Sequence, residues 1–189
     1  MSMGRLLFAV FASAGLGLGA HAAEPTGPSR QQLYNDAQAA FDRGDWTTAA
    51  TGLKKVLDGD PTPGPTYSKA VVSSRLAQAL TNLSRYAEAE ADANSAIAML
   101  SNSKSDVTAD LVEAYLALGD AQRYDLDEDG GAKAYRHALT LASTQTDSNQ
   151  SLDVKLGLIQ ATMTTDPETA ATVADTILSD KALLNTSPR

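Results

Sequence analysis

Apolar residues recur along this chain with a helical period, and short polar turns interrupt them. One arrangement occurs three times: an apolar helical stretch, a turn, and a second helix that opens with small residues. The turns lie at Gly44-Asp45-Trp46, at Ser84-Arg85-Tyr86 and at Leu126 to Gly131. No window alternates apolar and polar residues with period two, so no strand is predicted. The pattern therefore predicts an all-α chain built from repeated helical hairpins.

The three turns also share a register. Trp46, Tyr86 and Glu128 occupy equivalent positions, 40 residues apart from 46 to 86 and 42 apart from 86 to 128. A single hairpin of this kind cannot bury its apolar face alone, so copies are expected to stack side by side. The sequence thus predicts an α-solenoid, an architecture suited to binding a partner along its length.

The repeated residues resemble the tetratricopeptide repeat family, whose unit is a pair of antiparallel helices of about 34 residues. The likeness is strongest at small and aromatic positions of three copies: Ala37, Ala40, Trp46 and Ala49; Leu80, Tyr86, Ala89 and Ala96; Gly119, Gly131, Tyr135 and Ala138. A fourth, weaker copy runs from Leu152 to Leu178, with Asp166 and Pro167 as a helix start. The resemblance implies an α-solenoid of three to four such helix pairs.

The predicted organisation has three parts. Residues 1–22 form a signal peptide: Arg5 precedes an apolar run, and Ala20-His21-Ala22 supplies the small residues of a cleavage site. A polar Pro/Gly linker occupies 23–30. The repeat domain spans 31–185, with approximate repeats at 31–64, 67–104, 108–145 and 149–181. This organisation predicts a periplasmic or secreted protein that does not insert into the membrane after cleavage.

Composition removes several function classes. The chain has no cysteine, which excludes disulfides, thiol catalysis, cysteine-based metal sites and the lipoprotein route. Its formal net charge of -8 disfavours nucleic acid or an anionic membrane surface as the main partner. The catalytic motifs GxGxxG, GxxxxGK[ST], HExxH and GxSxG are missing, and His137 is the single histidine after the signal. We therefore predict a protein that is not an enzyme and that uses no cofactor.

One acidic segment invites a metal hypothesis. Asp125, Asp127 and Asp129, followed by Gly130, match the start of a calcium-binding loop. The twelfth position, where such a loop needs a bidentate Glu, is Arg136. Acidic residues here would equally favour the start of the next helix through its dipole. We interpret the segment as an acidic surface turn, with a weak calcium-responsive site as the alternative.

The resemblance also implies where a partner binds, because in the family the first helix of each pair lines a concave face. The positions that correspond in the three copies are Tyr34, Gln38, Phe41 and Asp42; Ser74, Gln78, Thr81 and Asn82; Leu116, Asp120, Arg123 and Tyr124. From these we predict as partner-binding residues Tyr34, Gln38, Phe41, Gln78, Asn82, Arg123 and Tyr124. The aromatic anchors are Tyr34, Phe41 and Tyr124, unless some of them pack between repeats.

The functional hypothesis is a non-catalytic adaptor or scaffold of the bacterial cell envelope that binds a peptide or protein on this concave face. The family's carboxylate clamp uses Lys and Asn where this chain has Tyr34 with Gln38 and Ser74 with Gln78, so the cytosolic chaperone role is not predicted. One alternative is a self-assembling structural protein, which would be a homo-oligomer. The other is the calcium-responsive binder.

Overall fold

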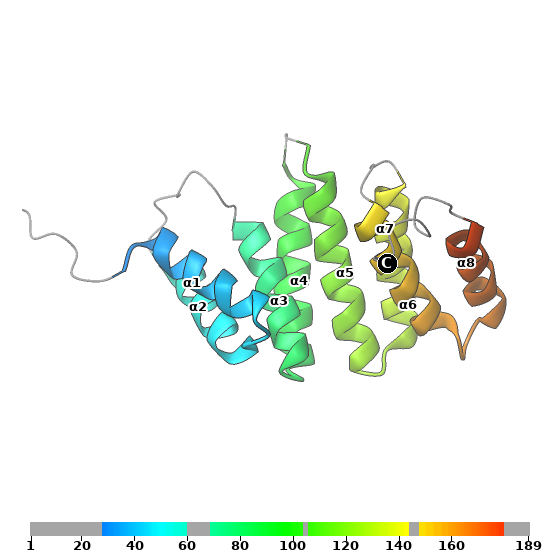
Figure 1. The fold of residues 1–189 in the computed structure, drawn as a ribbon, viewed down its shortest axis with the longest axis horizontal. Coiled ribbons are helices and arrows are strands. Elements are labelled where there is room, and N and C mark those ends of the chain that lie inside the picture. The colour runs from blue at the N-terminus through cyan, green and yellow to red at the C-terminus, as the bar shows by residue number, and fades with distance from the viewer. Residues whose placement is uncertain (1–27, 60–68, 104–105, 144–147, 180–189) are drawn as a thin grey trace, which may run out of the picture.

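The computed structural model describes residues 28–59, 69–103, 106–143 and 148–179, and within them the chain is helical with no strand (Figure 1). The predicted signal peptide and most of the linker lie outside the described residues, as do residues 180–185. The helices are α1 (Arg30–Asp42), α2 (Trp46–Asp58), α3 (Lys69–Asn82), α4 (Tyr86–Ser101), α5 (Thr108–Tyr124), α6 (Glu128–Ala142), α7 (Ser148–Thr162) and α8 (Pro167–Ser179). The predicted all-α class is confirmed.

The three repeated turns are built alike. Gly44, Ser84 and Leu126 each have a positive φ, of 73°, 57° and 67°. In each turn the next residue donates its backbone N–H to the carbonyl oxygen five residues earlier, at 2.9 Å in all three cases. Glycine adopts this backbone conformation without strain, whereas Ser84 and Leu126 adopt it at some cost. The register predicted from the sequence is therefore a repeated backbone geometry.

Aspartate side chains start three of the second helices. Asp45 accepts a hydrogen bond from the Thr48 N–H, and Asp127 accepts one from the Gly130 N–H, at 3.2 and 2.9 Å. Asp166 does the same for Thr169 at 3.1 Å. Such a cap satisfies a backbone donor that has no partner inside the helix. The hydrogen bonds lower the pKa of the Asp45 and Asp166 carboxyl groups.

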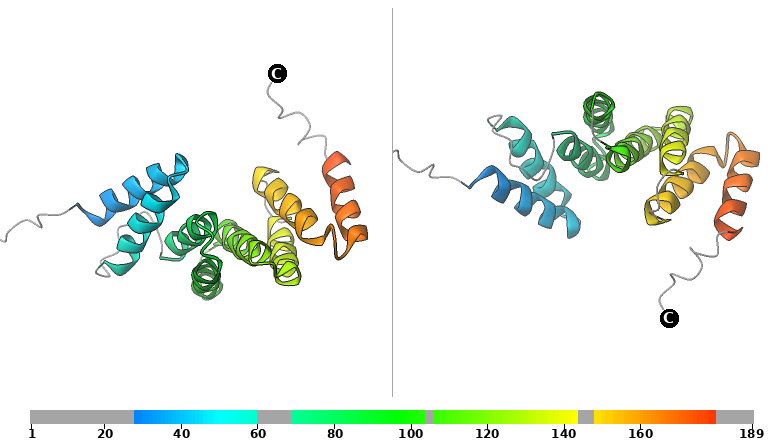
Figure 2. Two further views of the ribbon diagram at one scale, coloured as in Figure 1. Left: turned by 90° about the horizontal axis from the view of Figure 1, so that it is seen from below. Right: turned by 90° about the horizontal axis from the view of Figure 1, so that it is seen from above.

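The four hairpins stand side by side in a curved row (Figure 2). Consecutive helices pack against each other along the whole described chain, and α3 packs against α5 and α5 against α7. Helices α1, α3, α5 and α7 lie on the inner side of the curve, and α4 and α6 lie on the outer side (Figure 2). Among the neighbouring inner helices, α1 and α3 are the pair that differs, because their backbones make little contact. The predicted solenoid is confirmed, and its inner side is the concave face.

Small residues hold the helices close together. The main core is formed largely by alanines of α1 to α5, together with Leu53, Val56 and Val72. A Cβ on Gly52 would lie 2.7 Å from the Cβ of Ala37, so α1 and α2 touch where neither has a long side chain. Short side chains at contacts are what allow helix axes to approach this closely. The core thus fixes the positions from which inner side chains reach solvent.

Candidate partner-binding surface

Helix α3 defines the accessible strip of the concave face. Between Ala70 and Asn82 all residues are buried except Val71, Arg75, Gln78 and Asn82. Their spacing of four, three and four residues places them on one side of the helix. This strip, together with the inner residues of α1, α5 and α7, is the surface on which the predicted partner site lies.

Two positions that correspond in register do not reach this surface. Ser74 and Thr81 are buried, and their hydroxyl groups donate to the carbonyl oxygens of Ala70 and Ala77 at 3.2 and 3.0 Å. Helix α3 packs against α2, α4 and α5, which leaves it a narrower exposed strip than a helix at the end of the row. Gln78 and Asn82 do lie on the strip, and Asn82 donates its side-chain N–H to the Gln78 carbonyl oxygen at 2.9 Å.

The aromatic residues of α1 are partly structural. Tyr34 and Phe41 are half-buried and pack against the main core. The Phe41 ring meets Trp46 edge to face, with centroids 5.1 Å apart, and the Arg75 guanidinium lies 5.8 Å above it. Phe41 therefore joins α1 to α3 through side chains where the backbones stay apart.

Two buried polar atoms on this part of the face have no hydrogen-bond partner among the described residues. They are Nε of Arg75 and Oε1 of Gln38. The Gln38 side-chain nitrogen is engaged, since it donates to Asp42 at 2.7 Å. Leaving a buried donor or acceptor unsatisfied costs about 1 to 3 kcal/mol. A ligand that drew these half-buried side chains outward, and supplied an acceptor to Arg75 and a donor to Gln38, would recover that free energy.

Glu113 of α5 continues the polar strip. Burial raises the pKa of its carboxyl group, and the charge of Arg75 works against that rise. The two side chains therefore influence each other across α3 and α5, although no ion pair joins them. Sequence reasoning missed both residues. The spacing of 71, 75, 78 and 82 along α3 was the signal that could have identified Arg75.

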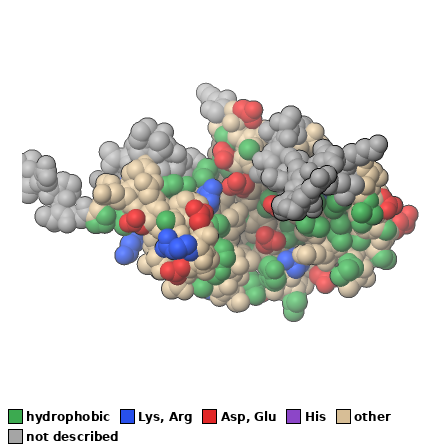
Figure 3. Space-filling model, in the orientation of Figure 1, with side chains coloured by type: hydrophobic (Ala, Val, Ile, Leu, Met, Phe, Trp, Pro, Cys, Tyr) green, Lys and Arg blue, Asp and Glu red, His purple; other side chains and the backbone are tan. Residues whose placement is uncertain are grey.

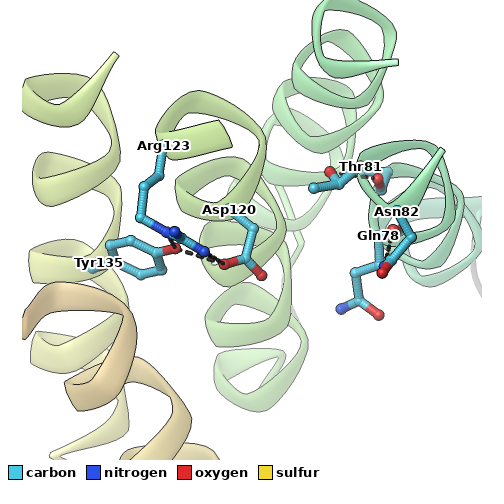
Figure 4. A network of polar contacts seen from close by, with 7 residues as sticks. Gln78, Thr81, Asn82, Asp120, Arg123 and Tyr135 are labelled. Carbon is cyan, nitrogen blue, oxygen red and sulfur yellow. Dashed lines mark hydrogen bonds and ion pairs between the residues drawn. The ribbon is translucent and has the colours of Figure 1, made fainter. Parts of the chain in front are cut away.

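Farther along, a polar network joins α5 to α6 (Figure 4). The Tyr135 hydroxyl donates to Oδ1 of Asp120 at 2.6 Å, and the Arg123 guanidinium contacts the same two groups at 3.5 and 3.9 Å. Burial raises the pKa of Asp120, while the Tyr135 hydrogen bond and Arg123 oppose the rise. Burial and the neighbouring Asp120 also raise the pKa of Tyr135, so its hydroxyl stays protonated and donates.

Two glycines make room for the Tyr135 ring, which is completely buried. A Cβ on Gly119 of α5 would lie 2.8 Å from the ring, and one on Gly157 of α7 would lie 2.4 Å from it. Both distances are shorter than carbon atoms tolerate, so the ring fits between α5 and α7 because these positions lack side chains. We call this space between Gly119 and Gly157 the cradle. Because the ring lies in it, the hydroxyl of Tyr135 on the outer helix α6 reaches Asp120 on the inner helix α5.

Arg123 and Tyr124 form a cluster with Tyr86, which the predicted partner site did not include. The Arg123 guanidinium lies 4.0 Å above the Tyr124 ring, and Tyr124 stacks on Tyr86 of α4 with centroids 6.1 Å apart. Tyr124 is 50% exposed. Stacking restricts both rings, which lowers the entropy lost when a partner packs on them.

The last inner helix changes the character of the face. The strip consists of Leu152, Leu156 and Ile159 on α7 and of Met163 directly after the helix, again spaced by four, three and four residues. Leu156 is 44% exposed and Met163 is 61% exposed. Figure 3 shows the concave face, with acidic side chains across its middle and hydrophobic side chains gathered toward its C-terminal end. The face therefore combines polar, charged and apolar side chains from α1 to α5 and is apolar at α7.

The acidic turn has separate structural roles for its residues. Asp127 caps α6, Asp125 is the C-cap residue of α5, and Asp129 lies in the first turn of α6. In the part of the chain that the structure describes, no group of three His, Cys, Asp or Glu side chains is placed to hold a metal ion. None of the described helices is long and apolar enough to cross a membrane. His137 stacks on Tyr115, with ring centroids 5.2 Å apart.

No protein-family model and no curated protein matches this chain by sequence. Solved structures do resemble it. They include the first tetratricopeptide repeat domain of Spaghetti (RPAP3) bound to the HSP90 peptide SRMEEVD, at 21% identity and a TM-score of 0.54, over 71% of this chain and 91% of that one. Another is the TPR2B domain of yeast Sti1 in a pHsp70 complex, at 20% identity and a TM-score of 0.58, over 71% of this chain and 97% of that one.

A bacterial structure is also similar. It is a tetratricopeptide-like protein of Chlorobium tepidum, at 14% identity and a TM-score of 0.59, over 71% of this chain and 93% of that one. These identities are low, so the likeness establishes how the backbone is arranged and leaves the ligand to be argued from the side chains. By its helix pairs, its repeated turns and these neighbours, the chain has the tetratricopeptide repeat fold that its sequence predicted.

Proposed function

We propose that the chain is a non-catalytic adaptor that binds a peptide or protein segment along the concave face. The observation that supports this most strongly is the pair of buried, unpartnered atoms, Nε of Arg75 and Oε1 of Gln38. One is a donor and the other an acceptor, which is the pairing that a polypeptide backbone offers. Two structures with the same fold are complexes with an HSP90 peptide and with pHsp70.

The two halves of the face define the chemistry of the segment. Between α1 and α5 the ligand meets Arg75, Gln78 and Glu113, which suit a polar stretch with exposed backbone groups. At α7 it meets Leu156 and Met163, which suit large apolar side chains. The proposed ligand is therefore an extended segment with a polar part followed by a hydrophobic part.

The proposal includes export to the periplasm or the medium and a role in the bacterial cell envelope. Its support is the pattern in residues 1–22: a basic start, an apolar run and small residues at the cleavage site. The formal charge of -8 agrees with a protein partner rather than nucleic acid. Cell fractionation, with the chain lacking residues 2–22 as the control, tests the location independently of binding.

Affinity capture from envelope extract tests binding. The bait is the chain from residue 23 onward, compared with a Gln38→Ala, Arg75→Ala variant. The matched control is Asn94→Ala, Lys133→Ala, which removes one amide and one cation from exposed positions of the outer helices α4 and α6. We expect the control to retain a partner that the concave variant loses, with both variants keeping the helical circular-dichroism spectrum of the parent. Equal retention by all three proteins would overturn the concave site.

A further inference from the structure

A second hollow lies on the opposite side of α3 from the concave face. It has a volume of about 650 Å³ and is bounded by α2 on one side, α4 on the other and α3 beneath. The α3 residues that line it are Lys69, Ser73, Leu76 and Leu80, and the last three fall between the positions of the concave strip. We call this hollow the outer groove. A ligand in it would not compete for the concave surface.

The floor of the outer groove is apolar. It is formed by Ala50, Leu57, Leu76, Leu80, Leu83 and Met99. Along α2 the lining runs from Thr47 to Asp58, which is about three helical turns or roughly 16 Å. Met99 at one end is 37% exposed. The groove therefore offers an apolar floor between α2 and α4, with polar and charged residues along its sides.

The two walls carry opposite charge at their centre. Lys54 and Lys55 stand on α2, and Glu88 and Asp92 stand on α4. Lys54 acts on both carboxylates, since its charge lowers the pKa of each. It nevertheless makes no hydrogen bond or ion pair with any described residue, and neither does Asp92. Glu88, in contrast, is paired with Arg85 at 2.7 Å.

Asp92 is half-buried in this wall. Burial is the main cause that raises the pKa of its carboxyl group, and Lys54 only partly offsets it. A carboxylate that has lost water without gaining a partner favours an incoming cation. The α4 wall is thus placed to receive a Lys or Arg side chain, and the α2 wall to receive a carboxylate.

We propose that the outer groove binds an amphipathic helix of a partner protein, with an apolar stripe on the floor, acidic residues toward α2 and basic residues toward α4. The floor and walls are helices whose backbone N–H and C=O groups are already paired, so an extended segment would find no backbone partners there. A helix satisfies its own backbone and needs only side-chain contacts. This site goes beyond the concave-face function and would let the solenoid hold two partners together.

Synthetic helical peptides test the charge arrangement. Three peptides share one leucine stripe and are stapled on the opposite face. The first carries Glu on one flank and Lys on the other, the second Lys on both flanks, and the third Glu on both. A helix can lie in the groove in either direction, and reversing it exchanges the walls that its two flanks face. The mixed peptide can therefore always place its Lys flank toward α4 and its Glu flank toward α2. We expect the parent protein to bind the mixed peptide about threefold to fivefold more tightly than either of the others.

Single charge reversals should then shift the preference among the three peptides. In Lys54→Glu the α2 wall carries a Glu beside Lys55 and loses its net positive charge, so the peptide with Lys on both flanks should gain affinity relative to the mixed peptide. In Asp92→Lys the α4 wall carries a Lys beside Glu88, which Arg85 already pairs, so the peptide with Glu on both flanks should gain affinity instead. Lys133→Glu on α6 and Asp175→Lys on α8 make the same changes at exposed positions away from the groove and should leave the order unchanged. A gain of binding by a reversed variant cannot come from unfolding.

Three results would overturn the proposal. One is equal affinity for all three peptides. Another is NMR shift changes that fall on the inner residues of α1, α3 and α5 rather than on α2 and α4. The third is light scattering that shows a concentration-dependent dimer which Lys54→Glu dissociates, because a second copy would then be the occupant. Loss of concave binding in the Gln38→Ala, Arg75→Ala variant leaves the expected peptide order unchanged, so the two proposals fail separately.

Discussion

At the N-terminal end of the inner row, α1 reaches α3 through side chains, whereas farther along α5 and α7 close around the Tyr135 ring. At the first junction the backbones stay apart, and Phe41 with Arg75 bridges the space. At the second junction Gly119 and Gly157 let the helices come up to the ring. At the second junction, close packing lets Asp120, Arg123 and Tyr135 contact one another. At the first junction, Arg75 and Gln38 each keep an atom without a hydrogen-bond partner. The difference indicates that binding capacity concentrates where packing is looser.

The largest expected effect comes from closing the cradle with Gly157→Ala. The new Cβ would overlap the buried Tyr135 ring, and overpacking of this kind costs about 2 kcal/mol even though Ala favours helix. Gly59→Ala is the matched control, because a Cβ there meets nothing closer than 3.4 Å and φ is -69°. Chemical denaturation should show a large loss for the first variant and little change for the second. A loss below about 0.5 kcal/mol for Gly157→Ala would contradict the cradle.

The sequence alone predicts the repeated turns but not the difference in packing between the two junctions. The turns were predictable because Gly44-Asp45, Ser84-Arg85 and Leu126-Asp127 recur at fixed spacing between apolar stretches. The cradle was not, since it depends on three residues from three helices that only the packing brings together.

The binding face shows the same limit. Gln78 and Asn82 were placed correctly on the exposed strip, because position within a repeat determines which side of α3 they take. Ser74 and Thr81 were not, since their burial depends on how tightly α3 is enclosed by its neighbours. The outer groove arises between two hairpins, so no single repeat contains its signature.

Removing only the hydroxyl group, with Tyr135→Phe, should have a smaller effect that depends on pH. The variant keeps the ring in the cradle but takes the hydrogen bond from Asp120, a loss of about 1 kcal/mol for a half-exposed carboxylate. That bond holds the pKa of Asp120 down against burial, so its loss raises the folded-state pKa further. A raised folded-state pKa means stability that is present in acid and lost as pH rises through it.

The stability deficit of Tyr135→Phe should therefore be small below the ordinary pKa of an aspartate and complete at neutral pH. Urea denaturation at a series of pH values measures it. The Asp120→Asn protein is the control, because with no carboxyl group at 120 the effect of Tyr135→Phe should no longer vary with pH. The same deficit at every pH would show that Asp120 and Tyr135 are not coupled.

The first junction can be examined with a double-mutant cycle between Phe41→Leu and Arg75→Leu. A guanidinium 5.8 Å from a ring centroid at a half-exposed site contributes about 0.5 kcal/mol. The coupling free energy from the four denaturation curves should have that size and a stabilising sign. Phe41→Leu paired with Lys133→Leu serves as the uncoupled reference. A coupling indistinguishable from that reference would mean that Arg75 does not help join α1 to α3.

The smallest expected change in stability is that of Arg75→Leu alone, although its expected effect on binding is large. Because Nε of Arg75 has no partner in the free protein, replacing it with an apolar group breaks no hydrogen bond. The lost contact with Phe41 and the relieved burial of an unsatisfied donor oppose each other, so the free energy of unfolding should change by less than about 0.5 kcal/mol. Capture of a concave-face partner should nevertheless fall severalfold, while Lys133→Leu leaves both quantities unchanged. If Arg75→Leu instead costs more than about 1 kcal/mol of stability with capture intact, Arg75 belongs to the framework of the first junction, and the open junction is not what equips this face for binding.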